Sequence, residues 1–203
     1  SGLPTGTVVD IPKLYDFIAR RAPGNSALST SRKEPDQPEF VSGFVGIQVC
    51  EVESAMSASS QSLMTDGAEI KAIIYNKDVR SSDYSKLANT PRPGHADYTA
   101  HVKYGGKADS RGGGAFSGRM TAPLCITGGI CKQLLEDKGI YINASIHDIH
   151  GNSDEPLSEI KKAQVLRDSV GGTISCTISG LPAGYGGPLF EGLEGRIAEI
   201  VYA

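Results

Sequence analysis

Residues 121–147 read TAPLCITGGICKQLLEDKGIYINASIH, which joins a helix pattern directly to a strand pattern. The apolar residues at the spacing of one helical face are Ile126, Ile130 and Leu134. Gly139 follows the last turn, where a residue of left-handed conformation commonly ends a helix. The sequence therefore predicts a helix over residues 121–137, followed at once by a strand over residues 140–147.

The remaining patterns place helices and strands in mixed order along the chain. Further helices are predicted from Asp10, a suitable N-cap, to about Arg21 and over residues 190–201. Further strands are predicted over residues 40–49, 69–75 and 172–179. Residues 54–67 fit a helix or a loop, and residues 77–119 show no regular pattern. This mixture predicts an α+β fold.

Composition limits the class of protein. The chain has 203 residues, of which 39% are hydrophobic and 21% charged, so it can form one substantial domain with a core. The net charge of −3 argues against a nucleic-acid partner. Four cysteines without zinc spacing indicate free thiols in a reducing compartment, and no apolar run reaches membrane-spanning length. We therefore expect a cytoplasmic protein with no membrane partner and no leader peptide.

Basic residues gather among glycines in the middle of the chain. The segments are Arg92-Pro-Gly-His-Ala-Asp-Tyr98, Lys103-Tyr-Gly-Gly106, Arg111-Gly-Gly-Gly114 and Ser117-Gly-Arg119. They hold too little apolar area for a core strand or helix. Glycines let a ligand approach the backbone closely, and the cations supply charge. This region therefore predicts a site for a small polyanion.

Each candidate in the basic segments also has a plainer interpretation. His95 suits a general acid or an anion ligand, and equally a loop histidine bonded to backbone. Arg92 and Arg119 suit bidentate binding of phosphate or carboxylate, although either alone could be solvated surface charge. Arg21 lies where a cation stabilises the end of a helix, and Arg32 belongs to a short charge run.

Several familiar site motifs are missing from the sequence. No Gly-Lys-Ser/Thr completes a P-loop, no strand leads into a dinucleotide-binding glycine motif, and no serine-hydrolase elbow is present. His147 and His150 lie three apart without a clear third ligand. We therefore expect no metal site.

These segments together resemble the central signature of chorismate synthase. Matching segments elsewhere are Arg20-Arg-Ala-Pro-Gly24, Ser26, Arg32-Lys-Glu-Pro-Asp36, Asp168-Ser-Val-Gly-Gly172 and Leu181-Pro-Ala-Gly184. The resemblance implies a lyase of aromatic amino acid biosynthesis, in the shikimate pathway. This family converts 5-enolpyruvylshikimate-3-phosphate to chorismate and phosphate by anti-1,4 elimination, with reduced FMN as cofactor. It also implies a homotetramer and a β-α-β sandwich fold.

By this resemblance, specific residues acquire roles. His95 is the catalytic histidine, which protonates reduced flavin or helps the phosphate leave. Arg21, Arg32, Arg92 and Arg119 bind the substrate. The residues assigned to the flavin are His95, Ser117 and Arg119.

The resemblance also implies a single chorismate synthase-like domain over residues 1–203 that is incomplete at both ends. A Gly-Glu-Ser-His-Gly motif and a C-terminal part of the family lie outside this sequence. An alternative therefore stays open, namely a non-catalytic anion-binding remnant of the family. A third reading, an RNA-binding loop protein, is disfavoured by the acidic total charge.

A short sequence echo suggests an internal duplication. Ser1-Gly-Leu-Pro4 with Gly6 recurs as Ser179-Gly-Leu-Pro182 with Gly184, and each copy precedes a predicted helix. The expected unit is a strand, a turn and a helix.

Overall fold

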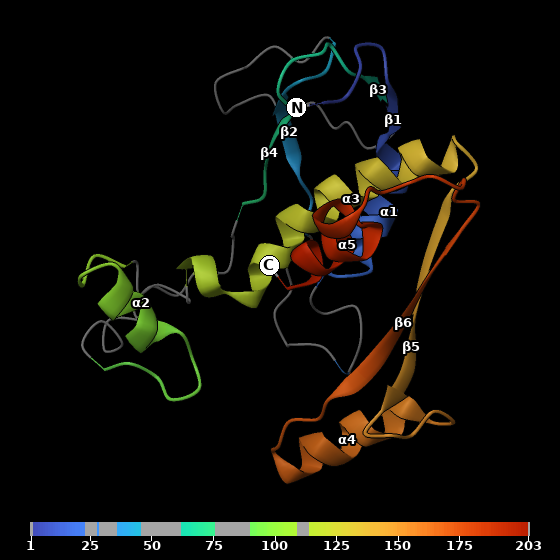
Figure 1. Cartoon of the computed structure of the whole chain (residues 1–203). Helices are drawn as coiled ribbons and strands as arrows, with labels where there is room; N and C mark the ends of the chain where they lie inside the picture. The colour runs from blue at the N-terminus through green and yellow to red at the C-terminus, as the bar shows by residue number, and fades with distance from the viewer. Residues whose placement is uncertain are drawn as a thin grey trace. The chain divides into compact units, whose positions relative to one another are not determined.

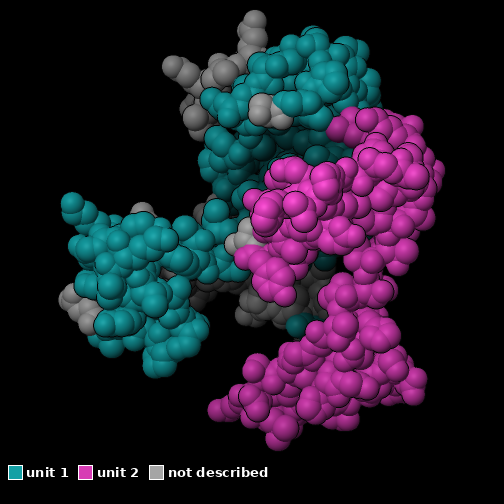
Figure 2. Space-filling view, in the orientation of Figure 1, with its two compact units in different colours: residues 1–131 teal, residues 132–203 magenta. Residues whose placement is uncertain are grey.

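The computed structural model describes residues 2–22, 28, 36–45, 62–75, 90–108 and 114–202. The chain divides into two compact units, unit 1 (Ser1–Cys131) and unit 2 (Lys132–Ala203), which Figure 2 distinguishes by colour. Helices and short strands mix in both, so the fold is α+β, as the sequence predicts. No helix in the described part of the chain combines the length and the apolar character that a membrane crossing requires.

The elements follow the chain as labelled in Figure 1. Unit 1 contains β1 (Val8–Asp10), α1 (Ile11–Ala19), β2 (Glu39–Ser42), β3 (Ser62–Met64), β4 (Lys71–Ile73), α2 (Asp97–Lys103), η2 (Gly114–Phe116), η3 (Gly118–Met120) and most of α3 (Thr121–Glu136). Unit 2 contains β5 (Tyr141–Ile149), α4 (Pro156–Leu166), β6 (Gly172–Ser179), η4 (Leu189–Glu191) and α5 (Leu193–Val201).

Helix α1 begins at the predicted cap. The Asp10 carboxylate accepts a hydrogen bond of 2.9 Å from the backbone N–H of Lys13, which satisfies one of the donors left open at a helix start. The helix buries Ile11, Leu14 and Ile18 on one face. It ends at Ala19, slightly earlier than the predicted limit near residue 21.

Strand β3 pairs antiparallel with β1, although the sequence left residues 54–67 open between helix and loop. A three-residue strand is too short to show a periodic pattern. Next to it, Thr65 is almost fully buried and its hydroxyl is satisfied on both sides. The hydroxyl oxygen accepts from the Thr7 N–H at 3.0 Å and donates to the Pro4 carbonyl at 2.7 Å. These bonds fix the N-terminal turn against the strand pair.

A second pair, β2 with β4, overlaps the two predicted strands 40–49 and 69–75, with β2 starting one residue earlier. Both observed strands are shorter than predicted, and residues 46–49 lie outside the described part of the chain. Phe40 and Phe44 meet edge to face, with ring centroids 5.1 Å apart. Phe44 is fully buried and contributes to the core of unit 1.

Helix α3 confirms the prediction for residues 121–137 and packs closely on α1. Ile126 and Ile130 are buried on its inner face. Gly129 lies where an added Cβ would come within 2.5 Å of the Leu14 Cδ1 atom and 2.9 Å of the Phe17 Cδ1 atom. The glycine therefore permits the close approach of the two helices.

Strands β5 and β6 form an antiparallel ribbon with two different faces. Cross-strand pairs on one face are Ile142 with Ile178, Ala144 with Cys176 and Ile146 with Ile174. The alternate face carries Asn143, Ser145, Ser175 and Thr177. The apolar face is open to solvent, with Ile146 46% and Ile174 63% exposed. Both strands confirm the sequence prediction, although β5 continues beyond residue 147 to Ile149.

Two helices were not foreseen. Helix α2 lies in the segment 77–119, for which the sequence predicts mostly irregular structure and no particular helix. Helix α4 begins with Pro156 in its first turn, and the Asn152 side chain accepts hydrogen bonds from the N–H groups of Asp154 and Glu155 just before it. Helix α5 starts three residues later than predicted, after η4.

The two copies of the sequence echo adopt similar backbone turns. Gly2 and Gly180 both have positive φ, +97° and +76°, as do Gly6 and Gly184, +83° and +95°. The copies differ in their surroundings: a Cβ at Gly180 would lie 2.0 Å from the Gly139 carbonyl oxygen, whereas one at Gly2 would meet nothing within 4 Å.

Candidate functional site

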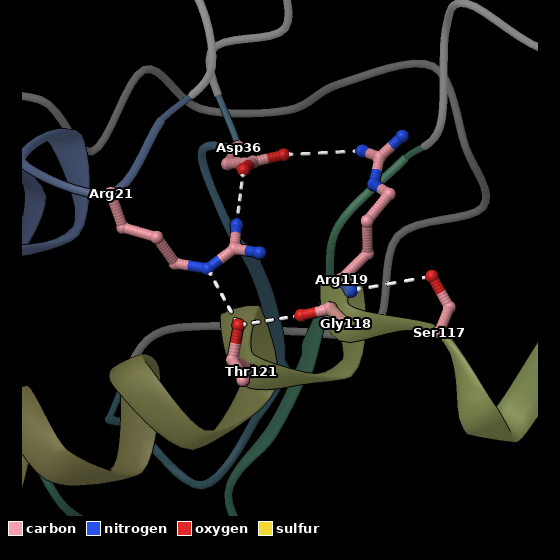
Figure 3. A network of polar contacts seen from close by, with 6 residues as sticks. All are labelled: Arg21, Asp36, Ser117, Gly118, Arg119 and Thr121. Atoms are coloured by element: carbon pink, nitrogen blue, oxygen red, sulfur yellow. Dashed lines mark hydrogen bonds and ion pairs between the residues drawn. The ribbon is translucent and has the colours of Figure 1, made fainter. Parts of the chain in front are cut away.

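Asp36 joins two arginines that come from distant parts of unit 1 (Figure 3). Arg21 follows helix α1, and its Nη1 atom lies 2.6 Å from Asp36 Oδ2. Arg119 belongs to η3, and its Nη2 atom lies 3.4 Å from Asp36 Oδ1. Each carboxylate oxygen therefore holds one guanidinium group. The structure thus brings together two of the four arginines that the sequence assigned to substrate binding.

The start of α3 supplies a second anchor for Arg21. The Arg21 Nε–H donates to the Thr121 hydroxyl at 3.0 Å, and this hydroxyl donates to the Gly118 carbonyl at 2.8 Å (Figure 3). The Ser117 hydroxyl accepts a hydrogen bond of 3.3 Å from the Arg119 N–H, which caps η3. The network therefore ties the end of α1 to the short helix that leads into α3.

The charges of this network favour an anion. Two guanidinium groups surround one carboxylate, so the three side chains carry a net charge of about +1. The Asp36 side chain is only 2% exposed, whereas the Arg21 and Arg119 side chains are 23% and 33% exposed. A ligand in solvent can therefore reach the two arginine side chains, whereas the carboxylate is shielded from solvent. Planar guanidinium groups suit phosphate and carboxylate ligands.

His95 and Arg92 form a local arrangement around the start of α2. The Asp97 carboxylate accepts hydrogen bonds from Arg92 Nε at 2.8 Å, Arg92 Nη2 at 3.0 Å and the Arg92 backbone N–H at 3.0 Å. These bonds, led by those from the side chain, lower the pKa of Asp97 to about 2. Between the two residues, Gly94 has a φ of +72° and His95 is exposed. The pair thus closes a turn that presents the imidazole to solvent.

The other two arginines assigned to the substrate are Arg32 and Arg92. Arg32 and residues 111–113 lie outside the described residues. Arg92 is bound through one edge of its guanidinium group to Asp97, in its own turn. In the described ranges, no group of three His, Cys, Asp or Glu side chains is arranged to hold a metal ion.

Sequence reasoning missed the roles of Asp36 and Thr121. In the sequence, Asp36 is the last residue of a segment that resembles the family, and Thr121 is the first residue of the helix predicted over residues 121–137. One signal was available: Asp36 is an acidic residue close to a basic run, with prolines on either side at positions 35 and 38. A carboxylate in that setting is a candidate partner for the arginines.

Comparison with known proteins gives the family. The chorismate synthase family profile matches residues 1–203. Chorismate synthase from Lancefieldella parvula is 35% identical over 241 aligned residues, covering 99% of this chain and 59% of that protein. Chorismate synthases from Thermococcus kodakarensis and Chitinophaga pinensis are each 37% identical, covering 99% and 100% of this chain and 58% and 55% of those proteins. The chain spans less than three fifths of the length of these relatives, and it belongs to the chorismate synthase family.

Proposed function

We propose that this chain supplies an anion-binding part of the active site of a chorismate synthase. That enzyme is the lyase that converts 5-enolpyruvylshikimate-3-phosphate to chorismate and phosphate. The observation that carries the proposal is the pair of arginines held by Asp36 in a member of this family. The substrate bears one phosphate and two carboxylates, and such groups bind arginine through paired hydrogen bonds.

The reaction requires charge stabilisation at the leaving group. The C3–O bond breaks as phosphate departs, a hydrogen is lost from C6, and the electrons of the C6–H bond move into the ring, so there is no net redox change. The phosphate gains negative charge as it leaves, and fixed cations aimed at it lower the barrier. Arg21 and Arg119 are the cations we assign to this role. When bound, reduced FMN supplies transient electron density to the elimination.

His95 is the proton donor we assign. Its imidazole is exposed in the turn before α2, and the three hydrogen bonds between Arg92 and Asp97 fix that turn. A protonated imidazole can give a proton to an oxygen of the departing phosphate. Arg92 stays a predicted substrate ligand, although Asp97 binds one edge of its guanidinium group.

The residues we assign to FMN are His95, Ser117 and Arg119. The described chain offers features that fit a flavin beside them. Tyr104 and Phe116, both about half exposed, form a tilted pair with ring centroids 6.4 Å apart, which is an apolar surface for a flat ring system. Arg119 can meet an anionic group of the cofactor.

We further propose the family's β-α-β sandwich with an internal duplication, a homotetramer and a cytoplasmic location. The matching positive φ values of the two Ser-Gly-Leu-Pro turns support the duplication. Sedimentation of the purified chain tests the tetramer, and a monomer at micromolar concentration would contradict it.

The decisive experiment is anaerobic incubation of the 203-residue chain with 5-enolpyruvylshikimate-3-phosphate and chemically reduced FMN. If these residues alone perform the lyase reaction, chorismate and phosphate form in equal amounts, and neither product forms with oxidised FMN. Arg119→Gln is the matched variant. We expect it to lower kcat/KM by about 10–1,000-fold, because the phosphate loses one of its two cationic partners. Full activity of that variant would exclude the arginine pair from the site.

A second candidate is an anion-binding protein without turnover. The observation that favours it is the composition of the assembled network, in which Arg21 and Arg119 bind the Asp36 carboxylate and Arg21 also binds the Thr121 hydroxyl. His95→Ala separates the two functions. In a lyase, His95→Ala lowers the rate of turnover and leaves much of the substrate affinity. If the wild-type chain binds the substrate and forms no product, the second candidate function is supported.

A further inference from the structure

A buried carboxylate in an anion site needs an explanation, because it repels the ligand. Asp36 lies between two arginines that we assign to phosphate or carboxylate binding, and its side chain is 2% exposed (Figure 3). Its backbone has a φ of +47°, a conformation that side-chain-bearing residues seldom adopt, although Asp and Asn tolerate it best. Strained residues of this kind persist where the surrounding structure holds them and often lie at functional sites.

The contacts of Asp36 set the distance between the two cations. Oδ2 holds Arg21 and Oδ1 holds Arg119, so the width of one carboxylate group fixes the separation of two guanidinium groups. Thr121, two residues after Arg119, accepts a hydrogen bond from the Arg21 Nε–H and so links the two arginine segments a second time. Two arginines placed together without an anion between them would repel each other, and their long side chains would move apart.

We propose that Asp36 is a positioning residue that holds the Arg21 and Arg119 side chains as a preorganised pair for one phosphate or carboxylate group of the substrate. This inference rests on the proposed function. A preorganised pair spares the ligand the cost of ordering two flexible side chains, which raises affinity without a direct contact. Asp36 itself does not touch the ligand.

Positioning and simple charge screening predict opposite changes in anion affinity when Asp36 is replaced by asparagine. Asp36→Asn keeps the shape of the side chain, keeps one acceptor oxygen and tolerates positive φ, but removes the charge. If Asp36 only screens the arginines, the net charge rises and anions bind more tightly. If Asp36 positions them, binding weakens by about tenfold, the size of effect expected when a charged hydrogen-bonding partner is lost.

The measurement is calorimetric titration of the 203-residue chain with 5-enolpyruvylshikimate-3-phosphate, and separately with inorganic phosphate. In turnover, we expect Asp36→Asn to lower kcat/KM by at least about tenfold, because the arginine pair both binds the phosphate and stabilises its charge as it leaves. Equal or tighter binding by Asp36→Asn would overturn the inference.

A second readout needs no ligand. In the free protein, ¹⁵N relaxation of the arginine Nε–H groups should show ordered Arg21 and Arg119 side chains, and Asp36→Asn should make both mobile. Thr121→Val, at an exposed helix start, should loosen Arg21 alone. If Asp36→Asn does not fold, Thr121→Val must weaken phosphate binding by a few-fold, and wild-type affinity in that variant would overturn the inference.

Failure of the inference and failure of the proposed function give different results. If the wild-type chain binds neither probe, or if Arg119→Gln binds as tightly as wild type, the anion site itself is wrong. If Arg119→Gln weakens binding and Asp36→Asn does not, the anion site stands and only the role of Asp36 is rejected.

Discussion

Gly128 and Gly129 are neighbours in α3, yet an added methyl group meets opposite surroundings at the two positions. A Cβ at Gly128 would meet nothing within 4 Å, whereas one at Gly129 would lie 2.5 Å from the Leu14 Cδ1 atom and 2.9 Å from the Phe17 Cδ1 atom. Replacing either glycine by alanine favours the helix by about 1 kcal/mol, because alanine loses less backbone entropy. The two substitutions therefore share this gain in helix free energy, and they differ in the packing of the added methyl group.

The contact at Gly129 is far shorter than the normal separation of about 3.5–4.0 Å between carbon atoms. Leu14 is fully buried, so relief requires a shift of α1 or α3, and such overpacking costs about 1–3 kcal/mol. Gly128→Ala should stabilise the chain by about 1 kcal/mol, and Gly129→Ala should leave it unchanged or destabilise it by up to about 2 kcal/mol. The difference between the variants, about 1–3 kcal/mol, isolates the helix contact.

Urea unfolding followed by circular dichroism measures this difference, since the chain has no tryptophan for fluorescence. With a slope of about 1–3 kcal/mol per molar, the two midpoints should separate by roughly 1 M. Equal stabilisation by both alanines, at unchanged slope, would refute the close packing of α1 on α3 at Gly129.

Three further predictions test other contacts. Thr65→Val should cost about 1–3 kcal/mol in urea unfolding, because a buried hydroxyl that bonds on both sides is lost; no change would contradict those bonds. Since the pKa of Asp97 is lowered to about 2 from 3.8, its pairing with Arg92 stabilises the turn above about pH 4 and is lost as the pH falls toward 2. An NMR titration should show this pKa moving back toward 3.8 in Arg92→Gln, and an unmoved pKa would count against the pairing. Gly180→Ala should lower stability by about 1–3 kcal/mol more than Gly184→Ala, because both positions have positive φ but only at Gly180 would the added Cβ lie 2.0 Å from a carbonyl oxygen, that of Gly139. Equal losses in thermal unfolding would argue against that close approach.

The elements that sequence reasoning predicted correctly are those with strong local signals. Helix α1 has a capping aspartate and an apolar stripe, and α3 has periodic isoleucines and a terminal glycine. The missed elements lack such signals. Strand β3 has three residues, and α2 is a seven-residue helix in a glycine-rich segment without a side-chain cap. Short elements of this kind depend on tertiary contacts rather than on propensity.

The candidate site was predictable in its cations but not in its geometry. Composition and the family resemblance pointed to Arg21 and Arg119, and the structure brings their guanidinium groups to one carboxylate. Nothing in the local pattern tells which acid they share, because Asp36 is far from Arg119 in the chain. The same pattern could not tell that Arg92 pairs within its own turn, since that depends on backbone conformation at Gly94.

During synthesis, the two strands of the β5–β6 ribbon leave the ribosome at different times. β6 begins at Gly172, more than twenty residues after β5 ends at Ile149, so at about 5–20 residues per second β5 leaves the ribosome roughly one to several seconds before its partner. Even when paired, a two-stranded ribbon is only marginally stable in water, and the isoleucine face of this ribbon is open to solvent. During that interval the isoleucine side chains of β5 lack even their partner strand, and an unpaired apolar strand of this kind favours aggregation of the newly made chain.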